Sequence, residues 1–130
     1  MILKSYDLYV ILYHMKWIVK FYDKFEPEFD ELDMQVQNEL LAHAIFLEKF
    51  GPQLGRPYVD TLKGSRYSNM KELRFKAANG VWRVAFAYDP KRQAILLIAG
   101  NKSGVGEKRF YKELIRKADD RFSDYLSTLK

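Results

Sequence analysis

The fold is decided by residues 71–88, which read KELRFKAANGVWRVAFAY. Apolar and polar residues alternate on both sides of Asn79-Gly80, and an Asn-Gly pair between two alternating runs is a strong signal for a β-hairpin. With Asn79 and Gly80 as the two turn residues, Ala78 pairs with Val81. The stretch therefore predicts two long antiparallel strands joined by a tight turn.

This register predicts one apolar face and one basic face. On the basic face, Lys76 lies directly across from Arg83, and Arg74 lies across from Ala85. We expect this face to be open to solvent. The apolar face should pack on the core and contains Leu73, Phe75, Ala77, Trp82, Val84 and Phe86.

The pairing of Lys76 with Arg83 is a clue to a ligand. Like charges directly opposite each other on an antiparallel sheet cost up to about 1 kcal/mol. A phosphate between them would remove that repulsion, and arginine forks suit phosphate oxygens. The alternative is that both side chains splay into water or pair with Glu72.

The segments after the hairpin predict a third strand and a helix. Residues 94–99 read AILLIA, a continuous apolar run typical of a strand buried on both faces in the middle of a sheet. Apolar residues at fourfold spacing then predict a helix from about Glu107 to Leu126 that packs on the sheet.

The segments before the hairpin predict a strand, a helix and a loop. Residues 17–21 alternate with a period of two and predict a first strand that is central or well covered. Asp33 can cap a helix that runs to about Phe50. Residues 51–70 are rich in glycine, proline and small polar residues and predict an ordered loop. The order of elements indicates an α+β fold.

Composition limits the classes of protein. A chain of 130 residues suits one domain, and the absence of cysteine excludes thiol nucleophiles, thiolate metal sites and disulfides. We expect a cytoplasmic protein. Polar residues such as Lys4 and Asp7 interrupt the apolar run near the N-terminus, so it predicts neither an export signal nor a membrane span. Because Met15 begins a cleaner amphipathic segment, we expect residues 1–14 to be an N-terminal extension and residues 15–130 to be the domain. No metal-spaced residues or phosphate-binding glycine loop occur, so we expect no metal and no cofactor.

The charge is divided unevenly along the chain. Residues 1–50 carry five Lys/Arg and nine Asp/Glu, whereas residues 51–130 carry seventeen and eight. Such a distribution is the electrostatic footprint of a surface that binds a polyanion, and RNA is the partner we expect.

Several side chains around the basic face are candidates for binding RNA. Tyr111 could stack on a base or donate a proton. With His14 and His43 as the only histidines, a histidine-pair ribonuclease is excluded, and Lys, Glu or Tyr must manage protons. The basic candidates in the preceding loop are Arg56, Lys63 and Arg66, and those after the last strand are Lys102, Lys108 and Arg109.

Four short motifs together resemble the RelE/ParE superfamily of toxins, in particular its phage-derived Gp49-like (HigB-type) branch. They are FGPQLGRP at residues 50–57, LKG at 62–64, KELR at 71–74 and WRV at 82–84. The resemblance covers roughly residues 15–126. It implies a small RelE-like fold: an N-terminal strand, a helix or helix pair, an antiparallel sheet and a C-terminal helix.

The resemblance also implies an activity. Members of this branch typically act as metal-independent endoribonucleases that cleave mRNA on the ribosome, inhibit translation and are neutralised by a helix-turn-helix antitoxin. By motif position, Lys63, Arg74 and Arg83 match the family's basic active-site residues, and Lys102 matches the lysine after its last strand. The usual aromatic residue with paired lysines is replaced here by residues 99–102, AGNK.

The leading hypothesis is therefore an mRNA endoribonuclease in which Arg74 and Arg83 hold the scissile phosphate. Lys63 or Lys102 would assist proton transfer. Further contacts to RNA are expected from Arg56, Arg66, Lys76, Lys108, Arg109 and Tyr111. Two alternatives remain: a noncatalytic ParE-like toxin that binds DNA gyrase, and an RNA-binding module without catalysis.

Overall fold

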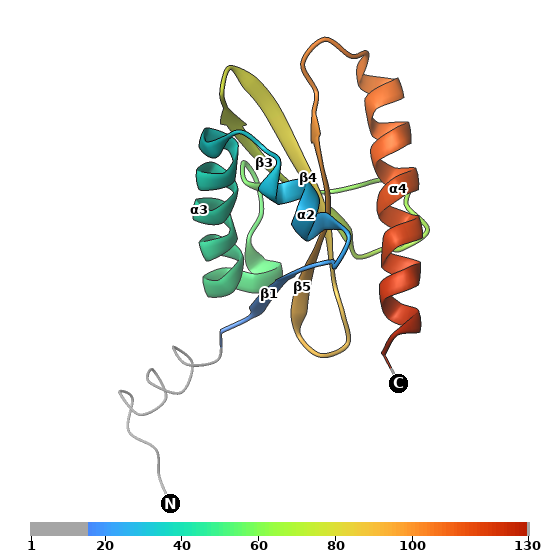
Figure 1. Ribbon diagram of the computed structural model, residues 1–130. Helices are drawn as coiled ribbons and strands as arrows, with labels where there is room; N and C mark the ends of the chain where they lie inside the picture. The colour runs from blue at the N-terminus through green and yellow to red at the C-terminus, as the bar shows by residue number, and fades with distance from the viewer. Residues whose placement is uncertain (1–15, 130) are drawn as a thin grey trace, which may run out of the picture.

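The computed structural model describes residues 16–129, which form a five-stranded sheet with helices on both faces (Figure 1). The strand order is β1-β5-β4-β3-β2. The strands are β1 (Ile18–Phe21), β2 (Val59–Thr61), β3 (Met70–Ala77), β4 (Gly80–Tyr88) and β5 (Gln93–Asn101). The helices are α2 (Phe25–Asp30), α3 (Met34–Phe50) and α4 (Glu107–Ser127), with a short 3₁₀ turn at Gly51–Gln53. This architecture confirms the α+β fold. The expected extension, residues 1–14, lies outside the described residues, so the domain boundary stays a prediction.

The β3–β4 hairpin forms as predicted, but the predicted register is wrong, because each strand is shifted by one residue relative to the prediction. Ala78 and Asn79 occupy the turn with φ angles of 50° and 61°, and Gly80 pairs with Ala77. Positive φ at both central residues is what a type I′ turn requires. Gly80 is needed for its small size and not for the turn, because a Cβ at this position would lie 2.9 Å from the side-chain nitrogen of Asn101.

The corrected register changes which charges meet. Arg74, and not Lys76, lies opposite Arg83, while Lys76 lies opposite Val81. The shift totals two residues, so each side chain keeps its predicted face. The predicted Lys76–Arg83 pair is therefore wrong, although a pair of like charges does exist on this face.

β5 is an interior strand, as its apolar run predicts. It lies between β1 and β4, and the residues from Ala94 to Leu97 are at most 1% exposed. The expectation for the first strand was wrong. β1 pairs in parallel with β5 alone and forms an edge, where Ile18 is 55% exposed.

Helix α3 covers one face of the sheet. Asp33 caps it by accepting a hydrogen bond from the Gln35 N–H at 2.8 Å, worth about 1 kcal/mol. Its buried stripe is Val36, Leu40, Ala44 and Leu47. The helix therefore begins and ends where the sequence predicts.

Helix α4 covers the opposite face (Figure 1), which the sequence predicted to be open. Arg83 is 7% exposed and Ala85 is fully buried beneath the helix. The prediction failed because the apolar stripe of α4 needs a surface to pack on. Small residues provide the room: a Cβ on Gly100 would already lie 2.9 Å from the ring of Phe110. The buried residues of α4 are Phe110, Leu114, Ala118, Asp119 and Phe122.

No helix within residues 16–129 combines the length and apolar character needed to cross a membrane. In the same part of the chain, no group of three His, Asp or Glu side chains is placed to hold a metal ion.

Candidate functional site

A pocket of about 380 Å³ opens between the sheet, the loop after β2 and the first turns of α4. Both polar and apolar side chains line it. They are Arg56, Asp60, Thr61, Leu62, Lys63, Glu72, Arg74, Glu107, Tyr111 and Ile115. The pocket thus brings together basic candidates from β3 and from the segments on either side of β2, and the candidate Tyr111 from α4.

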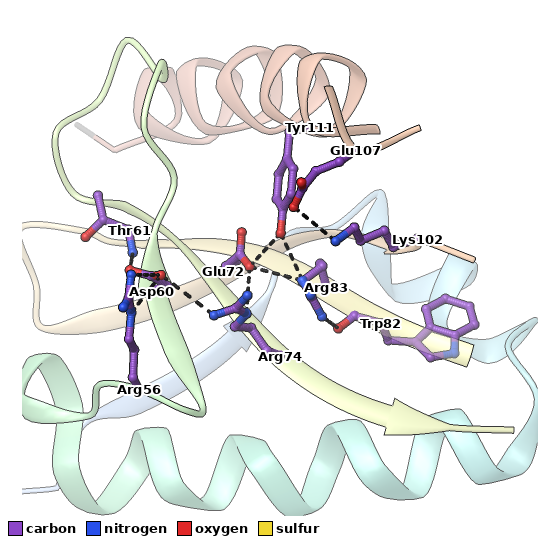
Figure 2. A network of polar contacts seen from close by, with 10 residues as sticks. All are labelled: Arg56, Asp60, Thr61, Glu72, Arg74, Trp82, Arg83, Lys102, Glu107 and Tyr111. Atoms are coloured by element: carbon purple, nitrogen blue, oxygen red, sulfur yellow. Dashed lines mark hydrogen bonds and ion pairs between the residues drawn. The ribbon is translucent and has the colours of Figure 1, made fainter. Parts of the chain in front are cut away.

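Glu72 is the centre of this site. Its side chain lies on the α4 face of β3, and the residue is 4% exposed. Its Oε1 accepts a hydrogen bond from the Tyr111 hydroxyl at 2.9 Å and lies 3.1 Å from the Nε atoms of both Arg74 and Arg83 (Figure 2). The carboxylate therefore lies between the two opposed arginines. The sequence offered this pairing with Glu72 as the alternative to a bound phosphate.

The two arginines differ in exposure. The Arg74 side chain is 32% exposed and lines the pocket, and its Nη1 lies 3.7 Å from Asp60. Arg83 has 9% of its side chain exposed and lies behind Glu72. Its Nε donates to the Tyr111 hydroxyl at 2.9 Å, and its Nη1 donates to the Trp82 carbonyl at 3.3 Å. Arg74 therefore faces the pocket, whereas Arg83 does not line it and contacts Tyr111 and Glu72.

The segments on either side of β2 supply two further cations. Lys63 is exposed and lines the pocket wall. Arg56 lines it as well, and its Nε and Nη2 atoms lie 3.1 Å and 3.0 Å from Oδ2 of Asp60. Asp60 thus ties Arg56 to Arg74 across the rim.

Lys102 lies at the other side of the site. Its Nζ donates to Oε1 of Glu107 at 3.1 Å and lies 6.0 Å from the centre of the Tyr111 ring. Lys102 does not line the pocket, but its partner Glu107 does. The structure therefore brings Arg74, Lys63, Arg56 and Tyr111 to the pocket. Arg83 and Lys102 do not line it but lie next to residues that do.

Four predicted RNA contacts lie elsewhere. Lys76 is exposed near the hairpin turn, and Lys108 and Arg109 lie on the exposed first turn of α4, beside a separate hollow. Arg66 points to the middle of α4, where it lies 3.8 Å from Asp119 and 3.2 Å from Asp120.

Asp119 anchors the loop between β2 and β3 to α4. This buried carboxylate accepts hydrogen bonds from the Ser65 hydroxyl at 2.5 Å and the Arg66 N–H at 2.9 Å. The Tyr67 hydroxyl also bonds to Ser123 on the same helix. The loop that carries Lys63 and the helix that carries Tyr111 are therefore joined.

The environment changes the proton affinity of the site. Burial raises the pKa of Glu72, which outweighs the lowering by the Tyr111 hydrogen bond and by the charges of Arg74 and Arg83. Burial also raises the pKa of Tyr111, despite the opposing hydrogen bond from Arg83. Tyr111 therefore keeps its proton at neutral pH. The remaining described histidine, His43, packs on Phe75 at the opposite face of the sheet, with ring centroids 5.3 Å apart.

Sequence reasoning named Glu72 only as an alternative partner for the opposed cations, and it missed the other two acidic residues of the site, Asp60 and Glu107. The available signal for Glu72 was its position two residues before Arg74, which places both side chains on one face of a strand. Nothing in the local pattern indicated that Asp60 and Glu107 would meet Arg56 and Lys102.

The chain matches a known protein family over most of its length. Residues 27–123 match the sequence model of the family described as Phage derived protein Gp49-like (DUF891). This match confirms the branch that the four motifs indicated.

Two proteins of Mycobacterium tuberculosis (strain ATCC 25618 / H37Rv) are similar to the chain. The toxin candidate HigB2 is 45% identical over 97 residues, which are 74% of this chain and 48% of that protein. The toxin candidate HigB3 is 49% identical over 82 residues, which are 63% of this chain and 69% of that protein. The chain thus spans about half the length of HigB2.

A solved structure shares the fold. It is a double arginine mutant of the E. coli toxin RelE in the free state, with a TM-score of 0.57 and 14% sequence identity. The superposition covers 82% of this chain and 98% of RelE. The fold expected from the motifs, a small RelE-like α+β domain, is confirmed.

Proposed function

Because the chain belongs to the family of phage-derived Gp49-like proteins, we propose that it is the toxin of a type II toxin–antitoxin system. The relatives that carry toxin names support this role. Its action would be to inhibit translation in the cytoplasm by cutting mRNA on the ribosome. A helix-turn-helix antitoxin would be its partner in the resting cell.

The observation that carries the proposal is the opposed pair Arg74 and Arg83 beside a pocket whose wall holds Lys63. RNA can be cut when its own 2′-hydroxyl attacks the neighbouring phosphate, which yields a cyclic phosphate and a free 5′-hydroxyl. Negative charge develops on the phosphate oxygens during this attack, and cations that are already in place stabilise it. No metal ion is needed for this chemistry.

The exposures of the side chains divide the roles. Arg74 and Lys63 line the pocket and would contact the phosphate, with Arg56 at the rim for the RNA backbone. Arg83 is buried and would act through Tyr111 and Glu72. Lys102 is paired with Glu107 and would contribute positive charge from beside the Tyr111 ring.

The test is to map new mRNA 5′ ends by primer extension after the protein is added to translating ribosomes. We expect cuts at ribosome-occupied codons from the wild type and far fewer from Arg74→Ala. The matched control is Arg116→Ala, which removes an exposed arginine paired with Glu113 on α4.

The outcomes separate the rival functions. An absence of cuts from protein shown to be folded contradicts the ribonuclease. Inhibition of DNA supercoiling with intact mRNA would then favour a gyrase-binding toxin. Salt-sensitive RNA binding without cuts would favour a noncatalytic RNA-binding module.

A further inference from the structure

The contacts of Glu72 are concentrated on one of its two carboxylate oxygens. Tyr111, Arg74 and Arg83 all reach Oε1, and no contact recorded within residues 16–129 ends on Oε2 (Figure 2). Oε2 has no such contact and yet is not fully buried. Glu72 also lines the pocket. Oε2 is therefore the oxygen that a ligand in the pocket can reach.

This arrangement differs from a bridge that serves packing alone. Arginine and carboxylate groups in structural pairs frequently bind through two parallel hydrogen bonds that use both oxygens. A buried carboxylate is also costly, and a well-packed apolar residue is often as stable in its place. Here three donors hold the carboxylate in position and leave one oxygen unused, which is the geometry of a preorganised base.

We propose that Glu72 is the general base of the cleavage reaction and that its Oε2 takes the proton of the attacking 2′-hydroxyl. This inference rests on the proposed function and assigns a residue that the basic motifs of the sequence did not. The new bond joins the 2′-oxygen to phosphorus as the bond from phosphorus to the 5′-oxygen breaks. The proton passes from the 2′-oxygen to Glu72.

Tyr111 completes the proton balance. Its hydroxyl lies 2.9 Å from Oε1 of Glu72 and can give a proton to the leaving 5′-oxygen. After the products leave, Glu72 releases the proton on Oε2 to water and the Tyr111 oxygen takes a proton from water, so no acid or base is consumed overall. The Arg83 Nε, 2.9 Å from the phenol oxygen, stabilises the charge that appears there between the two transfers.

The surroundings of Glu72 suit a base at neutral pH. Burial raises its pKa above the ordinary value of 4.5, which strengthens it as a proton acceptor. The Tyr111 hydrogen bond and the charges of Arg74 and Arg83 lower this pKa, whereas the charge of Asp60 raises it further. The other charged groups that line the pocket are Arg56, Lys63 and Glu107.

The decisive variant is Glu72→Gln. The amide oxygen can still accept from Tyr111, Arg74 and Arg83, while the NH₂ group replaces Oε2 and cannot take a proton. We would measure single-turnover cleavage of ribosome-bound mRNA and, separately, binding to mRNA with a 2′-deoxynucleotide at the cut site. Glu113→Gln, an exposed carboxylate paired with Arg116, is the control.

We expect Glu72→Gln to bind within about threefold of wild type and to cleave roughly 100-fold to 10,000-fold more slowly. Glu113→Gln should match the wild type in both measurements. Cleavage by Glu72→Gln within threefold of wild type overturns the base but leaves the ribonuclease standing. Equal losses of binding and cleavage also overturn it, because they show that Glu72 only positions the arginines.

The wild-type pH profile tests the same idea if Glu72→Gln fails to fold. The cleavage rate of the wild type should fall at acidic pH with an apparent pKa above 4.5. Glu72→Asp keeps a carboxylate but shortens its reach, so it should cleave slowly and show the same fall at acidic pH. A profile without an acidic limb overturns the base. A folded wild type that cleaves nothing at any pH overturns the proposed function and this inference together.

Discussion

Arg74 and Arg83 face each other directly across the β3–β4 hairpin, and the Nε atoms of both lie 3.1 Å from the same oxygen of Glu72. With Asp60 beside Arg74, and Arg56 paired with Asp60, three positive charges meet two negative charges, so the cluster keeps a net positive charge beside the pocket. Because the cluster is largely shielded from water, a phosphate that enters gains more from this charge than it would at an exposed surface.

Replacing Arg74 by lysine tests the shape of the cation as well as its charge. Arg74→Lys keeps the positive charge but loses the planar fork that binds two oxygens at once. We expect cleavage to fall roughly 10-fold to 100-fold, and Arg74→Ala to fall roughly 100-fold to 1,000-fold. Single-turnover cleavage of ribosome-bound mRNA measures these rates. Equal rates for Arg74→Lys and wild type would contradict a contact with two phosphate oxygens.

Tyr111→Phe removes only the hydroxyl that connects Arg83 with Glu72. The variant loses two hydrogen bonds to charged groups, so we expect the free energy of unfolding to fall by about 1–3 kcal/mol. Cleavage should fall by a larger factor in Tyr111→Phe than in Tyr58→Phe. The second variant is a matched control at a half-exposed tyrosine that packs against His43. Urea unfolding and cleavage rates check both parts, and a wild-type rate in Tyr111→Phe would remove this hydroxyl from the mechanism.

Gly100→Val tests the close contact between β5 and α4. A Cβ at this position would lie 2.9 Å from the Phe110 ring, so larger side chains must push the helix away. We expect a loss of about 1–3 kcal/mol in the free energy of unfolding. Gly55→Ala, where a Cβ meets nothing within 4 Å, should change it by less than about 0.5 kcal/mol. Equal melting temperatures for the two variants would contradict the contact.

The stability of the fold in acid should depend on Asp89, at the turn between β4 and β5. Burial alone would raise its pKa, but hydrogen bonds from the Tyr125 hydroxyl, from Gln93 and from the Lys91 N–H together hold the pKa below its ordinary value. A lowered pKa contributes stability that is present above the ordinary value of 3.8 and is lost as the pH falls through the lowered one.

We therefore expect wild type to exceed Asp89→Asn in free energy of unfolding by about 1–3 kcal/mol at pH 7, because the asparagine keeps only part of this network. The difference should narrow as the pH falls below 3.8. Urea unfolding across pH 2 to 7 measures it. A difference that does not change with pH would show that the charge of Asp89 contributes nothing.

The sequence predicted the long elements of the fold well because each has a strong local period. It did not predict the short ones: β2 and the 3₁₀ turn lie within residues 51–70, which were expected to form a loop, and no local period indicated α2. The cap at Asp33, the run at residues 94–99 and the stripe of α4 depend on neighbours in the chain. The place of β1 depends on which strand pairs with it, and a short alternating run carries no such information. Its four residues could not show that β5 alone would be its partner.

The site was predicted in part for a similar reason. The period of two placed Arg74 and Arg83 on one face, and this was correct despite the error in register. The burial of Arg83 depends on α4 crossing that face, which is a long-range contact. The pairs Lys102–Glu107 and Arg56–Asp60 each join a loop residue to a residue of a helix or strand, and the local pattern does not determine the side-chain rotamers that bring them together.

The attachment of the β2–β3 loop to Asp119 makes α4 the holder of two walls of the pocket. Tyr111 belongs to the helix itself, and the loop with Lys63 is bonded to it through Ser65 and Arg66. Separation of α4 from the sheet would withdraw both walls at once and leave the arginines on bare strands. The cleft is thus assembled by one docking event, and a molecule that prevents this event disables it without occupying it.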